Sequence, residues 1–420
     1  MAPFVSGISE QTTPISKAKQ ELSYEEVKTI KGRLSTPNWQ SAGDDGVYIN
    51  THFPSFYPVD IAHPTLPNKD LKRNIQGQLK DMTFKMGDGS TSTTLQEHLD
   101  NDFYRVRAVM MAHKGKVVFE AFPGMNPNQS HVWFSTSKTT VGSTVLMLEE
   151  EGLLDLEKMV TEYAVELKGT AWDNIPLKHA LNMAVALDLE ETTEAFLDPN
   201  SWIEQFFASL FAKDAAHDWI QMLRDVKPLP GLEPGSKFQY STAVTQVLML
   251  CCEHATNKNW VDIFNEHFWS KLHVKGEYKV GLSSNGEPVP GGINYTTPED
   301  MLKYAMSFLP ESWQNVADER VVPASVLKKI QTFGDPKAYE GCTEQGYSTV
   351  WFGETAERNS CQWDAVFADG AMFKHGNMHQ GIYVDPERDF CAMYFSTCPN
   401  DRPDYMPGFC RQAAKNLAGK

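Results

Sequence analysis

The sequence has little positive charge and no long apolar segment. Its 420 residues carry 38 Lys and Arg against 54 Asp and Glu, which gives a formal net charge of -16. Clustered basic residues bind nucleic-acid phosphates and anionic membrane surfaces, so this composition disfavours both partners. No run approaches the roughly 20 apolar residues of a membrane-spanning helix, and the N-terminus lacks the basic segment and apolar core of a signal peptide. We therefore expect a cytoplasmic protein with no nucleic-acid and no membrane partner.

Cysteine is also scarce, with seven residues that all lie in the C-terminal half. An odd number spread in this way fits a disulfide framework poorly, so we expect reduced thiols. Cys251 and Cys252, followed by His254, resemble a group of metal ligands. The surrounding segment 242–256 is apolar and helical in pattern, however, which favours packing in a core. No metal and no other cofactor is predicted.

Apolar residues make up 41% of the chain, enough for a substantial core and two or three structural units. Residues 1–95 are rich in Pro, Asn, Asp and Ser and predict an irregular extension packed on the body. Residues 96–140 and 290–420 predict one α/β sheet domain built from both ends of the chain, and residues 141–289 a mostly helical domain. Strands are expected at 105–112, 116–122, 347–352, 374–376, 381–384 and 390–395, and helices at 139–151, 177–183, 201–212, 215–225, 243–256, 260–271, 298–308, 324–330 and 403–418.

The first candidate site is Ser135–Lys138, with the sequence Ser-Thr-Ser-Lys. A lysine three residues after a serine lies one helical turn away, where an unprotonated amine can take the serine proton. Ser16 and Ser325 begin the same S-x-x-K pattern. Ser16 lies in a polar stretch, and Ser325 is interpreted as a helix N-cap. Only Ser135 follows strands and begins an apolar helix, which favours it as the nucleophile.

Two further segments carry candidate site residues. Tyr240 follows a Pro-Gly turn directly before an apolar helix, where it could relay a proton or simply pack its ring. The segment Lys374–Gly376 lies on a predicted strand, and its glycine allows a substrate to approach the backbone. The backbone N–H groups of Asn377 and Ser135 could form an oxyanion hole. His375 and His379 would lie about 13 Å apart on a strand, so they do not predict a metal site.

Together these segments resemble the serine β-lactamase and penicillin-binding-protein superfamily. Ser135–Lys138 matches S-x-x-K, Tyr240–Thr242 stands where the family has Y-x-N or Y-S-x, and Lys374–Gly376 stands where it has K-T-G or H-x-G. The similarity extends over roughly residues 100–400. It is greatest to the class C β-lactamase-like branch, which includes family VIII esterases, polyketide acyltransferases and 6-aminohexanoate-dimer hydrolases.

The resemblance implies an α+β fold in which an antiparallel sheet with flanking helices meets an inserted helical domain, with the active site in the cleft between them. It implies a serine hydrolase that forms an acyl-enzyme on Ser135. Lys138 and Tyr240 would share the proton transfer, and either could be the base. His375, Gly376 and Asn377 would bind the substrate from the sheet side.

Departures from the family pattern limit the range of substrates that we expect. Thr242 replaces the asparagine with which β-lactamases bind the substrate amide, and His375 replaces the threonine or serine of K-T-G, so β-lactam hydrolysis is not expected. Tyrosine is absent between Tyr163 and Tyr240, where 6-aminohexanoate-dimer hydrolases carry an extra one. We expect a small ester or amide as substrate, and Trp133, Phe134, Trp351 and Phe373 suggest an apolar or aromatic acyl pocket.

Two alternatives remain at this point. An acyltransferase would pass the acyl group to an alcohol or amine instead of water. A non-catalytic scaffold of the same fold would be expected to lack one of the reacting groups, whereas Ser135, Lys138 and Tyr240 are all present. The oligomeric state does not follow from the sequence.

Overall fold

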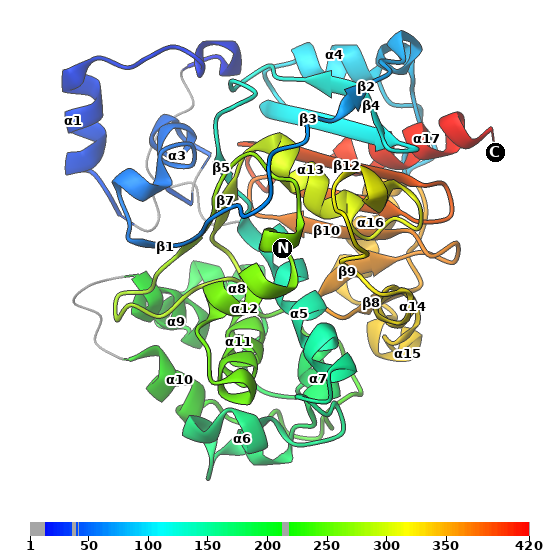
Figure 1. The fold of residues 1–420 in the computed structure, drawn as a ribbon. Helices are drawn as coiled ribbons and strands as arrows, with labels where there is room; N and C mark the ends of the chain where they lie inside the picture. The colour runs from blue at the N-terminus through cyan, green and yellow to red at the C-terminus, as the bar shows by residue number, and fades with distance from the viewer. Residues whose placement is uncertain (1–12, 36–38, 41, 212–217, 420) are drawn as a thin grey trace.

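Strands from both ends of the chain form one eight-stranded sheet in the computed structural model (Figure 1). The structure describes residues 13–35, 39–40, 42–211 and 218–419. Neighbouring strands are antiparallel except for the edge pair β2 and β4. Pairing of the late strand β12 with the early strand β3 confirms the predicted α+β fold and its sheet from both termini. In sheet order the strands are β2 (Lys72–Arg73), β4 (Lys116–Ala121), β3 (Val106–His113), β12 (Phe390–Ser396), β11 (Gln380–Asp385), β10 (Met372–Gly376), β9 (Trp363–Val366) and β8 (Arg358–Ser360).

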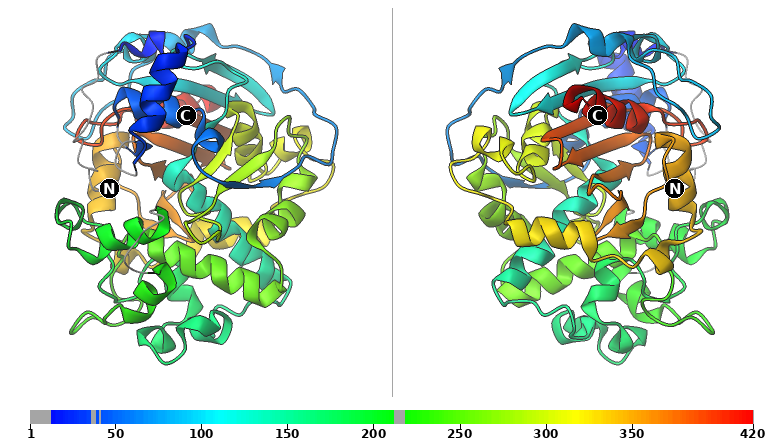
Figure 2. Two further views of the ribbon diagram at one scale, coloured as in Figure 1. Left: turned by 90° about the vertical axis from the view of Figure 1, so that its left-hand side faces the viewer. Right: turned by 90° about the vertical axis from the view of Figure 1, so that its right-hand side faces the viewer.

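Each face of this sheet carries its own apolar core, because successive side chains of a strand point to opposite faces. Met110 and Met393, which are paired across β3 and β12, belong to the core shared with the helical part of the chain. Met111 and Ala392 belong to the second core, which the C-terminal helix α17 (Met406–Ala418) covers. Figure 2 shows α17 in red along this face of the sheet. The sheet is therefore the middle layer between two sets of helices.

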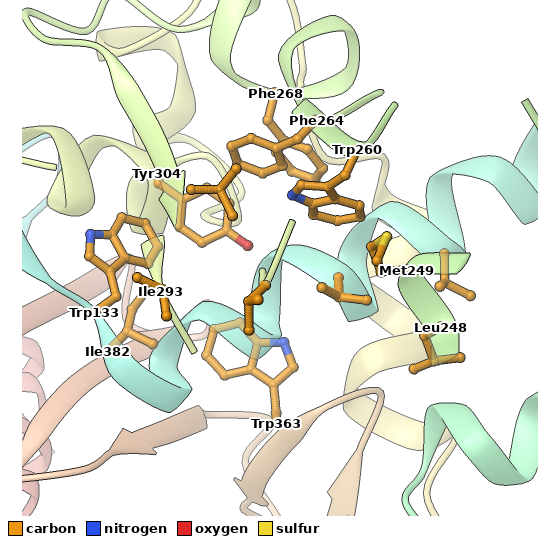
Figure 3. Packing of buried hydrophobic residues seen from close by; sticks show 14 of the residues in the cluster. Trp133, Leu248, Met249, Trp260, Phe264, Phe268, Ile293, Tyr304, Trp363 and Ile382 are labelled. Carbon is orange, nitrogen blue, oxygen red and sulfur yellow. The ribbon is translucent and has the colours of Figure 1, made fainter. Parts of the chain in front are cut away.

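The helical part packs against the sheet through large aromatic side chains (Figure 3). Trp260 and Phe264 of α12 and Phe268, the residue after this helix, gather around Tyr304 of α13, and Trp133 lies beside the same tyrosine. The long helix α11 is buried over most of its length, and there Cys251 and Cys252 pack in the core as predicted. Each helix predicted between 139 and 330 has a counterpart, and so has the C-terminal one, although residues 212 and 215–217 of two predicted helices lie outside the described residues. The counterparts are α5 (Lys138–Glu150), α7 (Leu177–Leu181), α9 (Trp202–Phe211), α10 (Trp219–Asp225), α11 (Thr242–Thr256), α12 (Trp260–His267), α13 (Pro298–Met306) and α14 (Ala324–Thr332). Two short helices, α6 (Val160–Tyr163) and α8 (Thr193–Leu197), were not predicted.

The N-terminal stretch is more regular than its composition predicts. Its described residues form two α-helices, α1 (Tyr24–Gly32) and α3 (Asp44–Ile49), and α4 (Leu95–Asp100) begins at the end of the stretch. They also supply the edge strand β2 to the eight-stranded sheet and the strand β1 to a smaller sheet that was not predicted. The order of strands in the smaller sheet is β1-β6-β7-β5. The four strands of this sheet are β1 (Val59–Ala62), β6 (Tyr278–Gly281), β7 (Asn294–Thr296) and β5 (His131–Val132). Pairing with distant strands provides hydrogen-bond partners that a local pattern does not reveal.

The strand predicted at 347–352 is wrong, because these residues end the helix α16 (Thr343–Phe352), which follows the short helix α15 (Pro336–Tyr339). The Sγ atom of Cys342 caps the first turn by accepting a bond from the Gln345 N–H at 3.4 Å. The helix ends at Gly353, whose φ of 68° suits a helix C-cap. The aromatic residues that suggested a strand instead share one helical face, since residues four apart lie above one another.

Two observations bear on the expected partners. Among the described residues, no helix is both long and apolar enough to cross a membrane. Within the same part of the chain, no group of three or more His, Cys, Asp or Glu side chains could hold a metal ion. All seven cysteines are unpaired in the structure, and six of them are buried.

Candidate active site

Ser135 lies in a tight turn that leads into α5. The turn is a short 3₁₀ helix, Phe134–Ser137, and its neighbours are buried whereas Ser135 is partly exposed. Phe134 has a φ of 49°, a left-handed conformation that is unfavourable for a side chain of its size. Stacking of its ring on Trp39, with ring centroids 5.7 Å apart, holds the turn in place. The strained turn exposes the Ser135 hydroxyl next to a rigid core helix.

Lys138 is fully buried and contacts Ser135 directly. Its Nζ atom lies 3.0 Å from Ser135 Oγ, 2.9 Å from Thr242 Oγ1 and 2.8 Å from the carbonyl oxygen of Gly291. Burial lowers the pKa of Lys138 from its ordinary value of 10.5 to about 7, because the charged ammonium loses its hydration. The lysine can therefore be neutral near physiological pH.

Tyr240 lies between two lysines just before α11. Lys138 Nζ is 5.2 Å from the centroid of its ring, and Lys374 Nζ is 4.5 Å from that centroid and 3.4 Å from the hydroxyl oxygen. Burial raises the pKa of Tyr240 well above 10, and the charge of Asp364 acts in the same direction. A hydrogen bond with Ser135 opposes this increase. The tyrosine is therefore protonated and within reach of the candidate nucleophile.

Lys374 and Asp364 are site residues to which the sequence interpretation assigned no role. Lys374 is fully buried on β10 and forms an ion pair with Asp364 of the neighbouring strand β9. The other carboxylate oxygen of Asp364 accepts a bond from the backbone N–H of His375 at 3.0 Å. The motif already indicated Lys374, but its carboxylate partner could have been found only from the register of β9 and β10.

His375 and Asn377 use their side chains within the protein. His375 Nε2 lies 3.0 Å from Asp404 Oδ2, and its ring stacks on Trp351 with centroids 4.5 Å apart. The Asn377 side chain donates to the carbonyl oxygen of Gln40 at 3.0 Å. These contacts hold the end of β10 against α16 and the N-terminal stretch, and they leave the backbone as the part of Asn377 suited to substrate binding.

Gly376 lies where β10 comes closest to the turn before Ser135. A Cβ atom at this position would be only 2.8 Å from the carbonyl oxygen of Trp133. The distance is shorter than any normal contact, so only glycine allows the strand to approach the turn this closely. In the structure the glycine accommodates the protein's own turn, and the approach of a substrate to Gly376 stays a prediction.

Three details of the sequence interpretation need correction. The rings of His375 and His379 lie 5.5 Å apart rather than 13 Å, because β10 ends at Gly376 and the chain turns back. Ser325 is not an N-cap, since it lies inside α14, where Pro323 is the cap and the serine donates to Glu150 at 2.8 Å. Trp133 packs against Tyr304 in the core rather than in an acyl pocket.

A small cavity adjoins Tyr240 and His375. Trp351 and Phe373 are among its lining residues, whereas Phe134 and Trp133 are not. Half of its lining residues come from α16. The lining residues are Tyr240, Glu344, Tyr347, Ser348, Trp351, Phe352, Asp364, Ala365, Phe373 and His375.

The site therefore combines a serine, a neutralisable lysine and a protonated tyrosine at the junction of a helical part and an antiparallel sheet. The sequence profile of the family described as Beta-lactamase matches residues 95–414, more than three quarters of the chain. The chain belongs to the β-lactamase family. As a member of this superfamily, the protein is a hydrolase.

Individual relatives of this β-lactamase-family protein agree with that assignment. It is 25% identical over 292 residues to a 6-aminohexanoate-dimer hydrolase of Paenarthrobacter ureafaciens, covering 66% of this chain and 68% of the relative. A Bacillus anthracis structure provisionally assigned as a 6-aminohexanoate-dimer hydrolase has a TM-score of 0.72 and 21% identity, over 92% of this chain and 98% of that one. The hydrolase EstCE1, described as having promiscuous acyltransferase activity, has a TM-score of 0.54 and 14% identity over 77% and 96%.

Proposed function

We propose that this protein is a serine hydrolase that forms an acyl-enzyme on Ser135 and hydrolyses a small ester or amide. The observation that carries the proposal is the set of hydrogen-bond partners around the Nζ atom of Lys138. A neutral amine has two N–H donors and one lone pair. Gly291 O and Thr242 Oγ1 can take the two N–H bonds, which leaves the lone pair for the proton of Ser135 Oγ at 3.0 Å.

Acylation would begin when Ser135 Oγ attacks the substrate carbonyl carbon and its proton passes to Lys138 Nζ. The backbone N–H groups of Ser135 and Asn377 are our candidates for stabilising the negative oxygen that forms. When the tetrahedral intermediate collapses, the bond to the leaving group breaks and that group takes a proton from Tyr240, which recovers one from Lys138. Water would then attack the acyl-enzyme with the same residues acting in reverse.

The face of α16 is the candidate wall for the acyl group. Tyr347 and Trp351 stack with centroids 5.0 Å apart, and Trp351 continues this stack onto His375. Such a surface favours a flat or apolar group next to the scissile carbonyl. His375 would then help to orient the substrate, while Gly376 keeps β10 close to Ser135.

Covalent labelling tests the proposal on the full chain. A fluorophosphonate probe should label the wild-type protein at Ser135, and p-nitrophenyl acetate should be turned over. Ser135→Ala should abolish both, whereas the matched S-x-x-K variant Ser325→Ala should retain both. Labelling that persists in Ser135→Ala would exclude Ser135 as the nucleophile. A product analysis with added alcohol or amine would distinguish hydrolysis from acyl transfer.

A further inference from the structure

Asp364 is a buried carboxylate for which the proposed steps have no role. In the hairpin of β9 and β10, Val366 pairs with Met372 and Ala365 pairs with Phe373. Continuing this register places Asp364 directly opposite Lys374. Asp364 and Lys374 are thus a cross-strand pair, in which one carboxylate oxygen contacts Nζ and the other accepts the N–H of His375.

The two lysines beside Tyr240 differ in their partners. Lys374 contacts a carboxylate, whereas the three polar contacts of Lys138 Nζ are a hydroxyl, a second hydroxyl and a carbonyl. Glu191 is the carboxylate whose charge most favours a protonated Lys138, but it is not among these contacts. A buried cation without a carboxylate in contact is costly, and two cations around one ring repel each other. The charged and titratable groups around Lys374 come from several elements. They are Asp364 on β9, His375 on β10, Lys138 on α5, Tyr240 before α11, Glu344 on α16 and Glu191 before α8.

We propose that Asp364 is a positioning residue that holds Lys374 as a cation beside Tyr240, so that only Lys138 serves as the base. This inference rests on the proposed function of Ser135. The cation would orient the tyrosine hydroxyl and favour its loss of a proton to the leaving group. Asp364 acts on the reaction through Lys374.

The proposal predicts how activity depends on pH. Activity should rise as Lys138 loses its proton near pH 7 and fall at high pH as Lys374 loses its own. Burial lowers the pKa of Lys374, and the ion pair with Asp364 opposes that decrease. Without the carboxylate, the high-pH decline should move down by about one to three pH units, the usual effect of an adjacent opposite charge.

The experiment measures kcat/KM of the full chain for an alkyl ester, whose alkoxide leaving group needs a proton, from about pH 6 to pH 10. In Asp364→Asn the high-pH decline should move to lower pH, while the rise near pH 7 stays in place. Asp364→Glu retains the charge and should restore most of the wild-type profile. Tyr339→Phe is the matched control, because Tyr339 donates to the backbone oxygen of Asp364 at 2.7 Å and its loss changes no charge.

Lys374→Arg tests the same idea without changing Asp364. An arginine stays charged over this range, so the high-pH decline should disappear in that variant even if Asp364→Asn does not fold. The role of Asp364 is overturned if activity declines at the same high pH in Asp364→Asn as in the wild type. It is also overturned if the high-pH decline persists in Lys374→Arg. Absence of wild-type labelling at Ser135 would instead overturn the proposed function, and this inference with it.

Discussion

Replacing Lys138 by methionine should inactivate the protein and at the same time make its stability less sensitive to pH. The methionine side chain has a similar length but no amine, so it can neither accept the Ser135 proton nor bond to Thr242 and Gly291. Loss of a general base lowers rates by about 10²- to 10⁴-fold. We expect hydrolysis of p-nitrophenyl acetate to fall within this range.

The stability effect follows from the pKa of Lys138, which burial lowers from 10.5 to about 7. Below pH 7 the lysine is protonated in both the folded and the unfolded chain, so folding must bury a charged ammonium. At about 1.4 kcal/mol per pKa unit, this burial lowers the free energy of unfolding by about 5 kcal/mol. Between pH 7 and 10.5 the unfolded chain binds the extra proton, so stability rises with pH. The methionine variant has no group that titrates at this position, so it lacks this pH-dependent contribution to the free energy of unfolding. From pH 5 to pH 9 the wild type should therefore gain about 3 kcal/mol relative to the variant.

Urea unfolding followed by tryptophan fluorescence at about pH 5, 7 and 9 measures this difference. The hydrogen bonds that Lys138→Met loses contribute equally at every pH, so the change in the difference isolates the lysine charge. Lys168→Met is the matched control, because Lys168 is exposed and should alter neither activity nor stability. Parallel stability curves for the wild type and Lys138→Met would show that Lys138 is not a buried, readily neutralised amine, and the assignment of the base would fail.

Two other substitutions test single contacts. Tyr240→Phe keeps the buried ring but removes the hydroxyl near Lys374. The kcat for an ester should therefore fall about 10²-fold with little change in KM. An unchanged kcat would contradict the proposed proton transfer through Tyr240. Gly376→Ala would place a Cβ 2.8 Å from Trp133 O and force β10 away from the Ser135 turn, so steady-state assays should find at least about a tenfold loss of kcat/KM. Gly77→Ala, whose Cβ meets no atom within 4 Å, is its control, and equal activities would refute the close-approach argument.

Local patterns predicted those parts of the site that depend on neighbours in the chain. Ser135 and Lys138 are one helical turn apart, so their contact follows from the helix alone. The strands β3, β11 and β12 follow from their apolar residues and the turns that bound them. The segment 347–352 was wrongly predicted as a strand because its aromatic residues are typical of strands. It is part of the helix α16, which is stabilised by its caps and by packing against β10.

Contacts between distant segments could not be predicted in this way. Asn377 contacts Gln40, 337 residues away, and His375 contacts Asp404, which belongs to the loop before α17. A residue's own neighbours in sequence contain no information about such partners, since they depend on how the sheet and helices pack. The Asp364–Lys374 pair is an intermediate case: once both strands are assigned and their register is known, the pairing follows.

The charge balance of the site explains why both lysines can be buried around one tyrosine. Lys138, Tyr240 and Lys374 come from α5, the segment before α11, and β10, so they meet only when the helical part is packed on the sheet. One carboxylate in contact can compensate one cation, and Asp364 is placed by strand register to compensate Lys374. Lys138 has no carboxylate in contact, and burial lowers its pKa to about 7 although the charge of Glu191 opposes the decrease, so the neutral amine that a base for Ser135 requires is populated near neutral pH. On this argument, the proposed reactivity of Ser135 is a consequence of the uneven pairing of the two lysines.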